Sequence, residues 1–192
     1  MNRRRVVITG LGCVTALSES VDELFTALCE GKSGVSTIES FDTSQYPVHF
    51  GGEIKHFDVS QYVDKREAKR MDRFTQFAIA GAINAVKDSG LDFAKEDPYR
   101  VGVIVGTGIG GIKEIEEQHV RLIEKGPGKV SPFCVPRLMS NAASGNIAIQ
   151  FGARGPCFAV SSACASGNHT IGEAFCNIAS NRSDVVITGG SE

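Results

Sequence analysis

The chain of 192 residues is long enough to bury one large core, and its composition excludes several classes of protein. Its formal net charge of −2 argues against a globally basic nucleic-acid-binding protein. No apolar stretch reaches the roughly 20 residues that a membrane-spanning helix needs. The six cysteines are scattered without C-x-x-C pairs, which predicts reduced thiols in a cytoplasmic protein and argues against a disulfide framework or a metal site.

Apolar runs alternate with helical patterns along the chain. Short continuous runs predict parallel strands buried on both faces, and they lie at 6–9, 101–105, 157–160 and 185–188. Helical spacing predicts helices over 21–30, 74–89 and 137–151, and glycines close the first two. Segments 36–60 and 91–100 are rich in loop residues. The alternation predicts an α/β fold with a mostly parallel sheet and helices on both of its faces.

Five basic residues lie within nine positions, at Lys65, Arg66, Lys69, Arg70 and Arg73. The last four of them would share one face of a helix. On an acidic protein such a face suits an acidic partner or a phosphate group. A solvated helix face is the commoner explanation of a charge run, and spacing alone leaves both interpretations open.

The segment 106–111 matches G-x-G-x-x-G directly after a strand, which is the dinucleotide-binding fingerprint. That fingerprint requires a second strand ending in an acidic residue about 20 positions later. Here the interval holds a polar helix pattern and then Gly126-Pro127-Gly128. We therefore expect glycines that let a loop and a helix approach neighbouring backbone, with a nucleotide site as the minor alternative.

Cys164 follows an apolar strand and a turn of small residues, and it opens a segment with helical spacing. A thiol at such an elbow projects from the end of the sheet, and the helix N-terminus favours its thiolate. This geometry suits acyl capture, whereas a buried structural cysteine is the alternative of about equal weight. His169 would lie on another helical face and is not expected to act as the base, so the site looks incomplete.

Nine segments, in this order and spacing, resemble the N-terminal half of a type II β-ketoacyl-[acyl-carrier-protein] synthase of the thiolase-like superfamily. They are 4–12, 41–44, 69–72, 88–91, 106–111, 131–133, 154–156, 162–167 and 189–192. Ser162 stands where threonine is usual, and it keeps the hydroxyl. The resemblance implies a layered α-β-α-β-α fold of which residues 1–192 supply the first pseudo-repeat, the C-terminal half being absent.

The same resemblance implies a decarboxylating Claisen condensation in fatty acid elongation. Cys164 would be the nucleophile, and its backbone N–H would be an oxyanion donor. Two histidines that assist decarboxylation belong to the family's C-terminal half, so we expect the isolated chain to be inactive and to expose apolar surface. No cofactor is implied. The alternatives are a thiolase-like acyltransferase that uses coenzyme A and a polyketide-type ketosynthase; a chain-length-factor-like subunit is disfavoured because Cys164 is present.

Further residues match family positions with assigned roles. Ile109 matches a position that lines the acyl pocket, and Cys134 matches one where the partner subunit of a homodimer closes that pocket. Arg66, Lys69, Arg70 and Lys129 match the surface that receives the acidic acyl carrier protein, and we call these four residues the basic surface. The resemblance thus favours partner binding over a solvated helix face.

Overall fold

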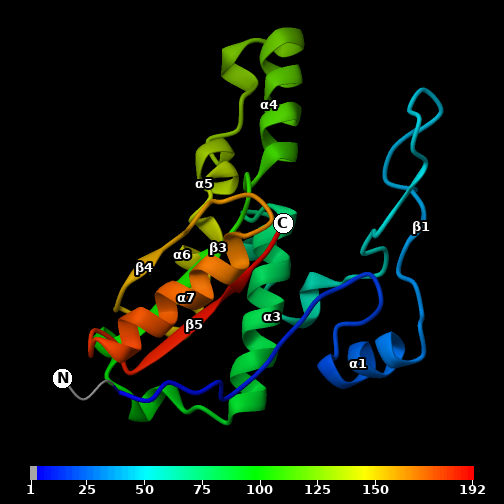
Figure 1. The fold of residues 1–192 in the computed structure, drawn as a ribbon. Helices are drawn as coiled ribbons and strands as arrows, with labels where there is room; N and C mark the ends of the chain where they lie inside the picture. The colour runs from blue at the N-terminus through cyan, green and yellow to red at the C-terminus, as the bar shows by residue number, and fades with distance from the viewer. Residues whose placement is uncertain (1–3) are drawn as a thin grey trace.

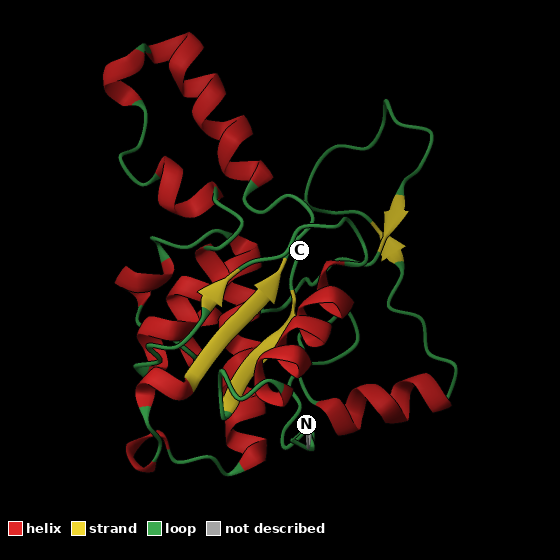
Figure 2. Ribbon diagram, turned by 60° about the vertical axis from the view of Figure 1, so that its left-hand side comes forward, coloured by secondary structure: helices red, strands yellow, loops and turns green. Residues whose placement is uncertain are grey.

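A three-stranded parallel sheet lies at the centre of the computed structural model, which describes residues 4–192. The strand order is β4–β3–β5 (Figure 2). The strands are β3 (Val101–Gly106), β4 (Cys157–Phe158) and β5 (Val185–Gly190). Val103 is in register with Cys157 on one side and with Ile187 on the other. Three of the four expected strands are therefore confirmed, and they form one parallel sheet.

Helices cover both faces of this sheet (Figure 1). Helix α7 (Ser166–Ala179) packs on one face against β3 and β5. Helix α6 (Ala142–Phe151) packs on the opposite face of β3, and α3 (Arg73–Ser89) packs against α6. The layered α/β arrangement expected from the sequence is confirmed.

Strand β3 is buried along its whole length, as its continuous apolar run predicts. Val103 and Val105 pack in the same apolar cluster as Ile79 of α3 and Ile147 of α6. The buried hydroxyl of Ser144 accepts a hydrogen bond from the Val105 backbone N–H at 3.0 Å and donates one to the Phe158 carbonyl at 2.9 Å. This side chain therefore links α6 to two strands inside the core.

The remaining elements lie around the layers. They are α1 (Val21–Cys29), β1 (Ser36–Thr37), β2 (Phe50–Gly51), η1 (Val59–Gln61), α2 (Lys65–Ala68), η2 (Phe93–Lys95), η3 (Pro98–Arg100), α4 (Ile112–Lys125), η4 (Pro127–Lys129) and α5 (Cys134–Leu138). Helices α4 and α5 pack together and form an arm that extends from the layers (Figure 1). Within the described part of the chain, no helix combines the length and the apolar character needed to cross a membrane.

The expectation of a strand over 6–9 is wrong. This segment is irregular, and Val7 and Ile8 are 64% and 79% exposed. It runs beside β5, but a hollow of about 420 Å³ lies between them, so no strand ladder joins the two segments. An apolar run forms a strand only where a neighbouring strand satisfies its backbone hydrogen bonds.

The single helix expected over 137–151 is also wrong, because the chain forms two helices, α5 and α6. Met139 has an extended backbone between them, with φ −66° and ψ 138°. A Cβ atom on Gly110 would lie 2.7 Å from the Leu138 carbonyl oxygen, and the Gly111 N–H donates to that oxygen at 3.1 Å. The glycine-rich loop thus binds a carbonyl group at the point where the helix is interrupted.

Candidate active site

Cys164 lies at the elbow between β4 and α7, and it is exposed. Ala163 has φ of +50°, a left-handed conformation that costs energy for a residue with a Cβ atom. A sharp, strained turn of this kind lifts the following side chain out of the fold. The helix begins at Ser166, so Cys164 lies just before the N-cap residue, Ala165, instead of opening the helix as expected.

Serine side chains hold this elbow in place. The Ser166 hydroxyl accepts a hydrogen bond from the Ser162 backbone N–H at 2.9 Å and donates one to the Ala163 carbonyl at 2.7 Å. The Ser161 hydroxyl donates to the Gly108 carbonyl at 2.7 Å, which joins the elbow to the glycine-rich loop. These contacts fix the backbone on both sides of Cys164 and so limit the positions that its thiol can take.

His169 contacts the elbow in a way that sequence reasoning missed. Its Nδ1 atom lies 2.6 Å from the hydroxyl oxygen of Ser162. The two residues are seven positions apart, a spacing that brings side chains together on one face of a regular helix, but here Ser162 precedes the helix. Neither residue lines the hollow into which Cys164 opens. His169 is thus placed to support the turn.

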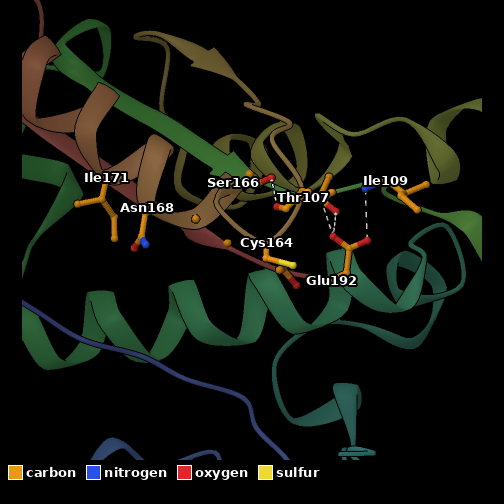
Figure 3. A pocket seen from close by; sticks show the side chains of 13 residues that line it. Thr107, Ile109, Cys164, Ser166, Asn168, Ile171 and Glu192 are labelled. Carbon is orange, nitrogen blue, oxygen red and sulfur yellow. Dashed lines mark hydrogen bonds between the residues drawn. The ribbon is translucent and has the colours of Figure 1, made fainter. Parts of the chain in front are cut away.

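A hollow of about 770 Å³ opens in front of Cys164 (Figure 3). Its walls come from the loop after β3, from the first turns of α7 and from the end of β5 with the residues that follow it. Cys164 projects into this space, and Ile109, Asn168, Ile171 and Glu192 line it as well (Figure 3). The carboxyl ends of the parallel strands thus meet at the thiol, as is common for ligand sites in α/β proteins.

Glu192 holds the glycine-rich loop from within the chain. Its carboxylate accepts hydrogen bonds from the Thr107 hydroxyl at 2.9 Å, from the Gly108 N–H, and from the Ile109 N–H at 3.3 Å (Figure 3). These N–H groups are the type that a dinucleotide phosphate would need. A Cβ atom on Gly106 would lie 2.8 Å from the Ser166 carbonyl oxygen. Close backbone approach therefore accounts for the glycines, as the sequence suggested.

The structure places Ile109 at the thiol, whereas Cys134, which was expected to close the pocket of a partner subunit, lies elsewhere. Ile109 lines the same hollow as Cys164, and it is 59% exposed. Cys134 begins α5 on the arm and is not among the residues that line this hollow.

The expectation that the basic residues share one helix face is wrong. Helix α2 ends at Ala68, and Arg73 begins α3. Arg73 is exposed, and its guanidinium lies 4.8 Å from the centre of the Phe77 ring and donates to the Ile54 carbonyl at 3.0 Å. Arg66, Lys69 and Arg70 are exposed on and just after α2, while Lys129 is exposed at the end of η4 on the arm.

Two of the other cysteines are poorly suited to nucleophilic attack. Burial raises the pKa of the Cys157 thiol above its usual value. Burial, together with the nearby Glu19 carboxylate, raises the pKa of the Cys13 thiol. A raised pKa lowers the fraction of thiolate at neutral pH, and the thiolate is the attacking form. All six cysteines lie in the described part of the chain and are free thiols there.

The chain is similar to known proteins over almost its whole length. Residues 3–192 match the family model described as "Beta-ketoacyl synthase, N-terminal domain". The chain is 46% identical, over all of its length, to 3-oxoacyl-[acyl-carrier-protein] synthase 2 of Vibrio cholerae, and it covers 46% of that protein. The chain therefore spans about half the length of the curated relatives that it matches.

Solved structures show the same fold. The ishigamide ketosynthase/chain length factor matches with a TM-score of 0.91 and 29% identity, covering 99% of this chain and 48% of that one. A structure of a type II PKS acyl-carrier protein in complex with its ketosynthase matches with a TM-score of 0.80 and 25% identity, covering 99% and 51%. Since the model of its N-terminal domain matches nearly every residue, the chain belongs to the β-ketoacyl synthase family.

Proposed function

We propose that the complete protein is a β-ketoacyl-[acyl-carrier-protein] synthase that elongates acyl chains on Cys164. The observation that carries the proposal is the exposed thiol on a strained elbow, facing a hollow at the carboxyl ends of the parallel strands. Curated relatives at 44–46% identity are named 3-oxoacyl-[acyl-carrier-protein] synthase 2, which favours fatty acid elongation over polyketide synthesis.

The reaction would proceed in two transfers. The Cys164 thiolate attacks the acyl thioester of the carrier protein, a new thioester forms on Cys164, and the carrier thiolate leaves. Malonyl-carrier protein then loses CO₂, and the electron pair of the broken C–C bond attacks the Cys164 thioester. A new C–C bond forms, and the Cys164 thiolate is released. The Cys164 backbone N–H is our proposed donor to the oxyanion that develops in each transfer.

The partner in both transfers would be acyl carrier protein, docked on the basic surface. Arg66, Lys69 and Arg70 are exposed, as binding an acidic partner requires. A ketosynthase of similar fold is known in complex with its acyl-carrier protein. We further propose a cytoplasmic homodimer in which Ile109 lines the acyl pocket and Cys134 of the partner subunit closes it.

A condensation assay on the complete protein tests this function. Purified enzyme is incubated with acyl- and malonyl-carrier protein, and the 3-oxoacyl product is identified by mass spectrometry. We expect product with the native enzyme and none with Cys164→Ala. Condensation of coenzyme A thioesters at a rate equal to or above that of the carrier thioesters would contradict the assignment and favour a thiolase-like acyltransferase.

A further inference from the structure

Helix α4 carries two buried polar side chains that the proposed chemistry does not use. Glu114 and Gln118 are each 4% exposed, and they lie one helical turn apart on the same face. Their other neighbours on this helix, such as Glu116 and Glu117, are exposed. Burying a carboxylate is costly unless it is paired, so the partners of Glu114 indicate what this face does.

Glu114 is joined through Arg137 to the end of α2. The Glu114 carboxylate accepts a hydrogen bond from Arg137 Nη1 at 3.0 Å, and only 5% of the Glu114 side chain and 24% of the Arg137 side chain are exposed. The other terminal nitrogen of Arg137 donates to the Lys69 carbonyl oxygen. That carbonyl lies at the C-cap of α2, where helix carbonyls lack partners within the helix.

Gln118 makes a corresponding connection to the other part of the basic surface. Its side-chain oxygen accepts a hydrogen bond from the Ser131 backbone N–H at 2.8 Å, two residues after Lys129. Arg70 also contacts the segment that follows Lys129, because its guanidinium lies 5.5 Å from the centre of the Phe133 ring. The buried face of α4 is therefore linked to the backbone beside both parts of the basic surface, directly through Gln118 and through Arg137 for Glu114.

The Glu114–Arg137 ion pair is not explained by a contribution to stability alone. Within the described residues, Glu114 Oε1, Arg137 Nε and Gln118 Nε2 are buried and find no hydrogen-bond partner. Each such atom costs free energy, and apolar residues of similar volume often replace a buried ion pair at no cost or with a gain. An arrangement that costs stability and fixes the spacing of two charged segments is more readily explained by positioning.

We propose that the buried Glu114–Arg137 pair is a strut that holds Lys69 and its neighbours in register with Lys129 for docking of the acyl carrier protein. Glu114 and Arg137 are then positioning residues, because Glu114 is buried and Arg137 acts through the Lys69 carbonyl. This inference rests on the proposed docking of carrier protein on the basic surface. It adds that the affinity depends on two residues beneath that surface as well as on the charges within it.

Glu114→Gln separates positioning from electrostatics. The change removes a negative charge beside the basic surface, so attraction alone predicts equal or tighter binding of an acidic partner. The strut predicts weaker binding, because the neutral amide leaves Arg137 without its charged partner. We expect affinity to fall roughly threefold or more, within the range seen for couplings carried through packed side chains. The matched control is Glu117→Gln, an exposed change on the same helix, which should bind equally well or slightly better.

A second variant guards against a simple folding defect. Glu114→Leu combined with Arg137→Met replaces the pair with apolar side chains, which buried sites commonly tolerate. This double variant should keep or raise the melting temperature and still lose roughly threefold or more in affinity, because the Lys69 carbonyl is no longer held.

The experiment measures the dissociation constant of the complete enzyme for acyl-carrier protein by calorimetry. A triple change of Arg66, Lys69 and Arg70 to Glu tests the docking site itself. If the triple change leaves binding intact at low salt, the docking proposal fails, and the strut fails with it. If the triple change weakens binding, the strut requires both the Glu114→Gln and the double variant to bind more weakly than Glu117→Gln. Any other combination overturns the strut and leaves the docking site standing.

Discussion

Two glycines, Gly167 in α7 and Gly190 at the end of β5, let the helix that follows Cys164 lie directly on the sheet. A Cβ atom on Gly190 would lie 2.9 Å from the Gly167 Cα atom and 3.2 Å from its nitrogen. Both neighbours are backbone atoms, so Gly190→Ala must move the start of α7 by about half an ångström to reach ordinary contact. Overpacking of this kind costs about 1–3 kcal/mol of stability.

Movement of α7 should also change the position of the Cys164 thiol and so the rate of its acylation. Cys164 lies just before α7, and a misplacement of about 1 Å can cost about 100-fold in rate. We therefore expect Gly190→Ala to slow the acylation of Cys164 roughly tenfold.

Gly167→Ala is the matched control, because a Cβ atom there would meet its nearest neighbour at 3.4 Å, an ordinary contact. It lies in a helix, where alanine is favoured over glycine by about 0.5–1 kcal/mol. In thermal unfolding of the complete enzyme, the melting temperature of Gly167→Ala should equal or exceed that of wild type, and the melting temperature of Gly190→Ala should be clearly below both. Equal melting temperatures for all three proteins would refute the close packing of α7 on β5.

Three further predictions follow from single side chains. Ile109→Phe should shift the products toward shorter acyl chains, because the phenyl ring is larger than the isoleucine side chain and fills more of the hollow in front of Cys164. An unchanged product profile would show that Ile109 does not line the acyl pocket. Hydrogen bonds from Arg100 and Arg4 hold the pKa of Asp184 well below its usual range. Its carboxylate therefore stabilises the fold when the pH is above the pKa of an unfolded aspartate, about 3.9, and this stabilisation is lost as the pH falls below that value. Asp184→Asn should therefore melt below wild type at pH 7, and a deficit that does not shrink below about pH 4 would contradict this. Burial is the main cause that raises the pKa of Asp72, so its ionised carboxylate destabilises the fold at pH 7. Asp72→Asn keeps a good helix N-cap and should raise the melting temperature at pH 7, with no such gain in acid, where Asp72 is protonated. A variant that melts below wild type at pH 7 would show that the charge is needed.

The sequence was informative where local chemistry decides the structure. Helix α3 was expected over 74–89, and it ends at Ser89, where Gly90 has φ of +65°, as the glycine indicates. Strand β3 is a continuous apolar run because both of its faces are covered. The elbow at Cys164 was found because small residues separate a strand from a helical pattern.

The rest depends on contacts between distant segments, which no local pattern encodes. The helix over 137–151 is interrupted where a glycine-rich loop 27 residues away binds the Leu138 carbonyl through Gly111. The Glu192 carboxylate reaches the Gly108 N–H across 84 positions. Arg73 was expected on the same helix face as Arg70, yet it begins α3, and its guanidinium lies over the rings of Phe57 and Phe77. The charge and the helical spacing of these arginines could not show that they belong to different elements.

The most direct test of the account is single-turnover acylation of the complete enzyme. The enzyme is mixed with acyl-carrier protein in the absence of malonyl-carrier protein, and its intact mass and cysteine-containing peptides are measured. We predict one acyl group per subunit, carried by the peptide that contains Cys164, and no acyl group on Cys164→Ala. An acyl group on Cys157, on Cys134 or on the Cys164→Ala variant would contradict the assignment of Cys164 as the nucleophile.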